Sequence, residues 1–180
     1  MVRKKVKGRA PTSVAAGSGI VSSSHLVSPR SSELSEFEFG LIVASNSFSR
    51  WVVRCMGTAG CPDLTSTDVV LLHHINHRAR NKKLADICFV LNYEDAHVVG
   101  YSLKKLVAAG LAQTEKLGKE VFYSPTLEGE ASVERYRGVR EQCLVSNLDT
   151  DRNADIGELA RLLRTMSGLY DQAARAACSL

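Results

Sequence analysis

Residues 82–111 place two amphipathic stretches one directly after the other. The first, KKLADICF, is long enough for a short helix only. In the second, apolar residues recur three and four positions apart, which is the spacing of a helix with one buried face. A short helix followed across a tight turn by a longer one is the arrangement of a helix-turn-helix unit. The expected buried positions of the longer helix are Ala96, Val99, Gly100, Leu103, Leu106 and Val107.

The residues before this segment predict two more helices. Apolar residues at helical spacing indicate a long helix from residue 32 to about residue 56. The sequence Thr-Ser-Thr-Asp at residues 65–68 is a capping-box pattern that opens the next helix. Asn92 or Asp95 is placed to cap the longer helix of the central segment.

Two short strands and two further helices are expected after it. Residues 111–114 and 120–124 have the composition of strands, and a polar turn at residues 116–119 joins them. After Pro125, two amphipathic helical segments follow. The expected fold class is therefore mainly α with a small β-hairpin wing, a winged helix-turn-helix flanked by N- and C-terminal helices.

Charge is distributed unevenly along the chain. Residues 1–31 are rich in Ser, Ala, Gly and basic residues, and we expect this tail to be disordered. Residues 1–30 contain six Lys or Arg and no Asp or Glu, which leaves 17 basic and 19 acidic residues in the rest of the chain. Nucleic-acid binding by the folded part would therefore depend on a local basic patch.

The sequence contains no signal for export or membrane insertion. No stretch approaches the roughly 20 apolar residues that span a membrane, and no apolar signal-peptide core follows the basic N-terminus. The five cysteines are scattered and include no C-x-x-C pair, which is typical of a reducing compartment. We expect a cytoplasmic protein that makes no contact with a membrane.

Several short segments fit one known pattern of winged-helix proteins. They are Leu64-Thr65, Leu84-Ala85-Asp86, Val99, Leu103, Leu106, Gly110-Leu111, and Ser124, Thr126 and Gly129 at the end of the hairpin. Together with the order of the elements, they resemble the MarR family of winged-helix transcription regulators over residues 34–175, most strongly over residues 64–129. The resemblance implies a homodimer that binds a palindromic operator and is released by a small phenolic or other ligand, or by thiol oxidation. It assigns residues 32–62 and 126–180 to dimerisation helices and residues 63–125 to the DNA-binding region.

The resemblance also implies which side chains meet DNA. In a helix-turn-helix the second helix enters the major groove, so its outward face is expected at base edges and nearby sugar-phosphate. On that face stand Tyr93, His97, Val98, Tyr101 and Ser102. Phosphate contacts are expected from Lys82, Lys83, Lys104, Lys105, Lys116 and Lys119.

The alternative of a winged-helix module that binds a protein rather than DNA stays open. Glu94 and Asp95, at the start of the longer helix, would repel phosphate, and the chain beyond the tail is slightly acidic.

Three histidines admit a metal hypothesis. His73, His74 and His77 are spaced to share a helix face. No Cys, Asp or Glu stands nearby in the sequence, and His74 occupies the position where an H-E-x-x-H hydrolase has Glu. We therefore expect no metal site, no cofactor and no enzymatic activity.

A small-molecule site and a redox site are the remaining hypotheses. Cys55 and Cys61 form a candidate redox pair beside Arg54, although free cysteines are more often small buried hydrophobes. A pocket for a small aromatic or phenolic effector is expected between the dimerisation and DNA-binding parts. Its predicted lining is Phe48, Trp51, Cys55, His73 and His77.

Overall fold

The structure is a computed structural model that describes residues 27–77 and 81–180. It divides into two units, one up to Ser49 and the other from Arg50 onward. The disordered tail expected at residues 1–31 falls mainly on residues 1–26, outside the described residues. Within the described ranges, no helix has both the length and the apolar character to cross a membrane.

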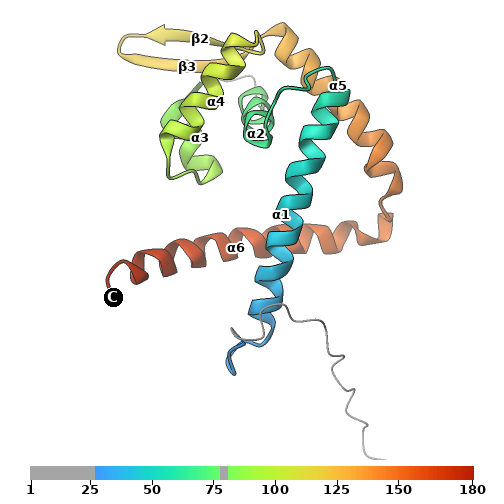
Figure 1. Cartoon of the computed structure of the whole chain (residues 1–180), viewed down its shortest axis with the longest axis vertical. Coiled ribbons are helices and arrows are strands. Elements are labelled where there is room, and N and C mark those ends of the chain that lie inside the picture. The colour runs from blue at the N-terminus through green and yellow to red at the C-terminus, as the bar shows by residue number, and fades with distance from the viewer. Residues whose placement is uncertain (1–26, 78–80) are drawn as a thin grey trace, which may run out of the picture. The chain divides into compact units, whose positions relative to one another are not determined.

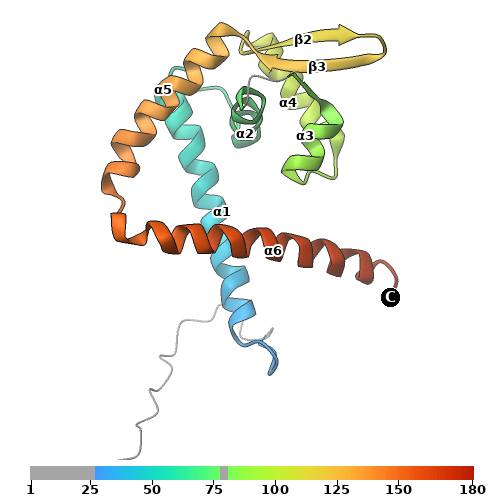
Figure 2. The same ribbon diagram turned by 180° about the vertical axis from the view of Figure 1, so that it is seen from behind.

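The helices and strands of the described residues follow the predicted order (Figures 1 and 2). The expected fold class is confirmed. The elements are α1 (Glu33–Thr58), α2 (Ser66–Asn76), β1 (Lys82–Lys83), α3 (Leu84–Leu91), α4 (Ala96–Ala108), β2 (Ala112–Leu117), β3 (Glu120–Pro125), α5 (Leu127–Cys143), the 3-10 turns η2 (Val145–Asn147) and η3 (Thr150–Arg152), and α6 (Asn153–Ala177).

Local side chains set the ends of the helices in the helix-turn-helix. The capping box is confirmed at α2, where the Thr65 hydroxyl accepts from the Asp68 amide and the Asp68 carboxylate accepts from the Thr65 amide. Of the two caps considered for α4, Asp95 fills the role, because its carboxylate accepts from the amide of His97 at 2.8 Å. Asn92 instead ends α3 in the left-handed conformation, with φ 56°.

The sheet is larger than predicted. Its strand order is β1-β3-β2, with antiparallel pairing throughout. Lys116 and Leu117, expected in the turn, are the last residues of β2, so Gly118 and Lys119 form a two-residue loop. Gly118 has φ +64°, which a glycine adopts without strain at the first position of a tight hairpin turn. In both views the β2–β3 hairpin extends past α3 and α4 (Figures 1 and 2).

Strand β1 was not predicted. Its two residues, Lys82 and Lys83, were assigned to the start of the short helix, but they pair with Tyr123 and Phe122 of β3. Two lysines have no alternation of apolar and polar residues, so the sequence carries no strand signal there.

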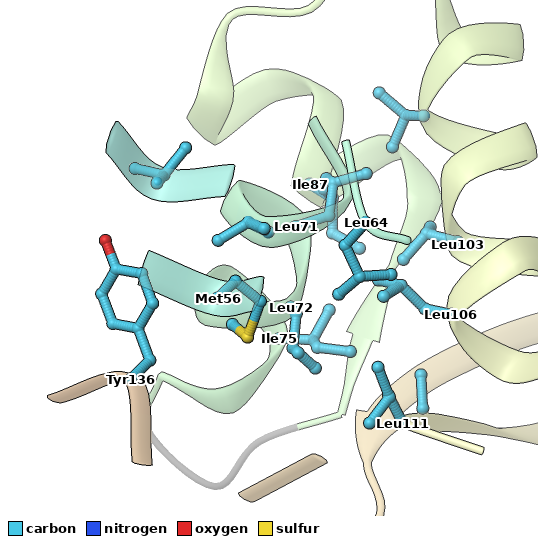
Figure 3. Packing of buried hydrophobic residues seen from close by; sticks show 14 of the residues in the cluster. Met56, Leu64, Leu71, Leu72, Ile75, Ile87, Leu103, Leu106, Leu111 and Tyr136 are labelled. Atoms are coloured by element: carbon cyan, nitrogen blue, oxygen red, sulfur yellow. The ribbon is translucent and has the colours of Figure 1, made fainter. Parts of the chain in front are cut away.

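The core of the second unit joins α2, α3 and α4 with the end of α1 and part of α5. Figure 3 shows Leu103 and Leu106 of α4 facing the side chains of α2. Val99, Leu103 and Leu106 are fully buried, which confirms the expected core face of α4. Of the other expected positions, Ala96 is exposed and Gly100 and Val107 are half-buried, because they lie at the edge of that face.

Thr126 joins the base of the hairpin to α5. Its hydroxyl donates to the carbonyl of Gly110 at 2.6 Å and accepts from the amide of Gly129 at 3.0 Å. Its own amide donates to the carbonyl of Leu111 at 3.2 Å. Gly129 lies so close to Leu111 that a Cβ atom added there would collide with the Leu111 carbonyl oxygen. The start of α5 therefore depends on a residue without a side chain at position 129.

Two glycines of α5 provide a matched test of this close approach. Gly129→Ala should lower the free energy of unfolding by about 1–3 kcal/mol, because the added methyl group has no space. Gly138→Ala should raise it by about 0.4–1 kcal/mol, because no atom lies within 4 Å of the added Cβ and alanine restricts the unfolded chain. Urea unfolding of both variants at one protein concentration measures the difference. Equal changes in the free energy of unfolding of the two variants would contradict the close approach of Gly129 to Leu111.

Candidate nucleic-acid interface

The outward face of α4 carries four exposed side chains, those of His97, Val98, Tyr101 and Lys104. Residues three and four apart in a helix are neighbours on its surface, so the four form one strip. Tyr101 is 75% exposed and Val98 is 45% exposed. The opposite face is fully buried, so the fold itself holds α4 with this strip outward.

Ser102 and Lys105 do not belong to this strip, and the prediction that they face outward is wrong. Ser102 is buried, and its hydroxyl donates to Oδ1 of Asp68. Lys105 is half-buried, and its ammonium donates to Oδ2 of Asp68 and to the carbonyl of Asp63, both at 2.7 Å. Both side chains lie on the side of α4 that packs against the start of α2, where Asp68 occupies them.

Asp68 is the anchor between α2 and α4. Its carboxylate is 2% exposed and accepts from the Thr65 amide, the Ser102 hydroxyl and the Lys105 ammonium. Burial alone would raise the pKa of Asp68, but these hydrogen bonds, led by that from Lys105, outweigh it and hold the pKa below its ordinary value. The carboxylate is therefore charged at neutral pH, and it fixes α4 against α2.

Lys82 and Lys83 also have partners inside the fold. The ammonium of Lys82 donates to the carbonyls of Ile75 and His77, at 3.1 and 2.6 Å, where α2 ends. Lys83 forms a 2.6 Å ion pair with Glu120 of β3. These two lysines stabilise the junction of α2, β1 and β3.

Tyr93 is half-buried and packs against the core cluster, so its ring is partly withdrawn from the face on which it was expected. It precedes the first turn of α4, where the chain turns back towards the core.

The wing keeps two exposed lysines, Lys116 and Lys119. Among the described residues neither has an ion-pair partner. The nearby carboxylates are occupied, because Glu115 accepts from the Asn81 amide at 2.8 Å and Glu120 pairs with Lys83. The wing therefore exposes two lysines without ion-pair partners among the described residues, although the charge of Glu115 beside them is not cancelled by the neutral Asn81 amide.

The residues predicted to form an effector pocket lie in different surroundings. Cys55 is part of the core, and the ring of His73 packs edge-to-face on Tyr136 with 4.4 Å between the ring centroids. His77 is exposed and borders a hollow of about 550 Å³ that none of the other four predicted residues lines. The hollow is lined by His74, His77, Asn81, Lys82, Asp86, Phe89 and Val90.

Cys55, in the last turns of α1, and Cys61, in the loop after it, have separate partners. The thiol of Cys55 donates to the Tyr136 carbonyl, and that of Cys61 to the Ser132 hydroxyl, each at 3.5 Å. Burial raises the pKa of the Cys55 thiol, which lowers the fraction of reactive thiolate. In residues 27–77 and 81–180, no group of three or more His, Cys, Asp or Glu side chains is arranged to hold a metal ion.

Sequence reasoning missed the contribution of α2 to this surface. Thr65 and Thr67, at the start of α2, border a shallow hollow of about 310 Å³ together with Val98 and Tyr101 of α4. The capping box identified Thr65 and Asp68 as the helix start, but it contains no signal for what lies across from them. The start of α2 therefore lies beside the outward strip of α4 and belongs to the candidate interface.

Replacing Asp68 by Asn tests the anchor. The change should lower the free energy of unfolding at pH 7 by about 1–3 kcal/mol, because the three hydrogen bonds that the charged carboxylate accepts are weakened or lost. The pKa of Asp68 is depressed in the fold, so its contribution is present above the unfolded-state pKa of about 3.9 and is lost as pH falls through the folded-state pKa.

Urea unfolding at pH 7 and at about pH 3 measures this contribution. Between the two pH values, the free energy of unfolding should fall less for Asp68→Asn than for the native chain. Asp86→Asn, at an exposed carboxylate on α3, is the control and should behave like the native chain. If the free energy of unfolding falls by the same amount in Asp68→Asn as in the native chain, Asp68 does not anchor α4.

Comparison with known proteins agrees with this geometry. Residues 64–129 match the model of a winged helix DNA-binding domain. Among curated proteins, no sequence matches the chain significantly.

Solved structures match over most of the chain. A probable transcriptional regulator from Pseudomonas aeruginosa is 20% identical with TM-score 0.55, covering 70% of this chain and 96% of its own. AbfR of Staphylococcus epidermidis is 17% identical with TM-score 0.62, covering 74% and 91%. A cysteine-to-serine variant of MarR from E. coli, complexed with operator DNA, is 20% identical with TM-score 0.55, covering 72% and 97%.

The expected resemblance is thus confirmed at the level of the fold. Residues 64–129 form a winged helix domain, and the chain has the fold seen in the MarR structures.

Proposed function

We propose that this protein is a MarR-type transcriptional regulator that binds a palindromic operator as a homodimer. The observation that carries the proposal is the exposed strip of His97, Val98, Tyr101 and Lys104 on a helix whose other face is fully buried. An α-helix presented in this way fits the DNA major groove. The similar folds of a MarR variant complexed with operator DNA and of reduced AbfR bound to DNA support it.

The basic patch in this proposal is smaller than the sequence indicated. Of the six lysines expected at phosphates, Lys104, Lys116 and Lys119 are exposed without an ion-pair partner among the described residues. We assign phosphate contacts to these three. Lys104 lies on α4 and the other two on the wing, so together they would contact the backbone on either side of the strip.

Adjacent lysines of α4 make a matched pair for testing the interface. Lys104→Ala should weaken binding to duplex DNA and reduce the slope of log K against log salt concentration by about one, with no change in melting temperature. Lys105→Ala should lower the melting temperature, because Asp68 loses its cation.

Fluorescence-anisotropy titration of the chain with duplexes from its own promoter region, at several salt concentrations, measures both effects. If Lys104→Ala leaves affinity and salt slope unchanged, the assignment of this face to DNA is wrong. If no duplex gives a saturable complex even at low salt, the alternative of a protein-interaction module is favoured.

The dimer part of the proposal rests on exposed apolar side chains. None of the residues of α6 is buried. Its large apolar residues repeat at helical spacing along one face and are between 37% and 51% exposed. Contiguous exposed apolar surface of this kind marks an interaction site. These residues are Ile156, Leu159, Leu162, Leu163 and Leu169.

We therefore assign residues 32–62 and 126–180 to dimerisation. In the first unit, α1 likewise exposes Phe39, Ile42 and Phe48. A two-fold symmetric dimer would present two copies of α4 to half-sites about one helical turn apart.

Charged residues on the apolar face of α6 should separate the protomers. Leu159→Glu together with Leu162→Glu should convert a dimer into a monomer and reduce operator affinity by at least ten-fold, because each winged helix would then bind alone. Arg164→Glu, on the polar side of the same helix, is the charge-matched control and should leave the dimer intact. Light scattering coupled to size-exclusion chromatography gives the masses. A native chain that is monomeric at micromolar concentration would remove this part of the proposal.

Control by a small effector also belongs to the proposal. The hollow beside α2 and α3 has a volume within the usual range for ligand sites. Phe89, 86% exposed, gives it an apolar side, and His74, His77 and Lys82 give it a polar one. With Asp86 also in its lining, this mixed apolar and polar surface suits a small aromatic or phenolic effector better than the predicted pocket around Cys55 does. Thiol oxidation at Cys55 is disfavoured by its raised pKa.

A further inference from the structure

We propose that α4 recognises the operator through the C5-methyl groups of thymine, contacted by Val98 and Tyr101. This inference rests on the proposed function, since it names the feature of DNA that the α4 strip reads. Thymine is the base that presents a methyl group in the major groove, and apolar side chains are the groups that contact it.

The first argument is the exposure of apolar surface without a structural reason for it. Val98 is 45% exposed and Tyr101 is 75% exposed, although Val99, Leu103 and Leu106 already complete the core face of α4. The two exposed residues are three positions apart, which makes them neighbours on the helix surface. They also border the same hollow at the start of α2, whose other lining residues are polar or charged, so the apolar part of this surface is confined to Val98 and Tyr101.

The second argument is the small number of polar groups on the strip that could read other bases. Among the residues of α4 there is no Arg, Asn or Gln, and Lys, which can also contact guanine, occurs only as Lys104 and Lys105. Ser102 and Lys105 have the right chemistry for base or phosphate contacts, but Asp68 holds both. The polar groups left on the outward strip are therefore His97, the Tyr101 hydroxyl and the Lys104 ammonium.

The third argument concerns the position of charge on the strip. Lys104 follows Tyr101 by three residues on the same side of α4 and is exposed. An ammonium there would hold the backbone while Val98 and Tyr101, nearer the start of the helix, meet base edges, because the N-terminal part of a recognition helix lies deepest in the groove. The apolar surface of Val98 and Tyr101 therefore lies beside His97 where bases would be contacted, and the ammonium of Lys104 lies where phosphates would be contacted.

The test begins with selection of bound duplexes from a pool with a randomised central region, using the full chain. Thymine should be enriched at one or more positions in each half-site. The selected duplex is then remade with uracil at those positions, which removes only the methyl group. Each replacement should weaken binding by about four-fold, the effect of one methyl group withdrawn from apolar contact.

Protein variants connect the methyl effect to named side chains. Val98→Ala should bind the thymine duplex more weakly and should reduce the ratio of thymine to uracil affinity towards one. Tyr101→Phe should keep that ratio, because the ring remains. Lys104→Ala, the control, should weaken binding to both duplexes equally. Melting temperatures confirm that each variant folds, as expected for exposed positions.

The outcomes separate this inference from the proposed function. Saturable binding with equal affinity for thymine and uracil duplexes would overturn the inference and leave the DNA-binding function standing. Enrichment of guanine in place of thymine would overturn it as well. A chain that forms no saturable complex with any duplex in the pool would remove both.

Discussion

The arrangement of the winged helix domain depends on one buried carboxylate, that of Asp68. It caps α2 through the Thr65 amide and at the same time holds α4 through Ser102 and Lys105. Burying a charge is costly unless hydrogen bonds and an opposite charge compensate for it, and here both are present. The same carboxylate caps the start of α2 and positions α4. It therefore helps to set the direction in which α4 presents its outer side chains.

This anchor divides α4 into three sides with different roles. Val99, Leu103 and Leu106 fill the core, Ser102 and Lys105 bind Asp68, and the remaining strip faces solvent. Neighbouring residues in a helix point about 100° apart, so Lys104 and Lys105 differ in role although they are adjacent. For the DNA binding that we propose, the consequence is a strip with His97, one lysine and two side chains that expose apolar surface, which favours contact with methyl groups over a network of charged hydrogen bonds.

The base of the wing is held by a different kind of contact. Thr126 bonds to the backbone at the end of α4 and to the first turn of α5, and Gly129 allows α5 to approach Leu111. The wing, α4 and α5 therefore meet within a few residues of one another. A change in the direction of α5 would therefore shift the base of the hairpin, which carries Lys116 and Lys119.

The features that the sequence determined by itself are those set by neighbours along the chain. The 3.6-residue period of α4, the capping box at Thr65 and Asp68, and the hairpin turn at Gly118 all arise from residues a few positions apart, and each could be predicted. The tertiary structure decided which polar side chains stay exposed for the DNA contacts that we propose. Ser102 and Asp68 are 34 positions apart, and Lys105 and Asp68, like Lys83 and Glu120, are 37 apart. No local pattern records such pairs, because they form only when packing brings separate helices and strands together, and so half of the predicted lysines proved to be structural.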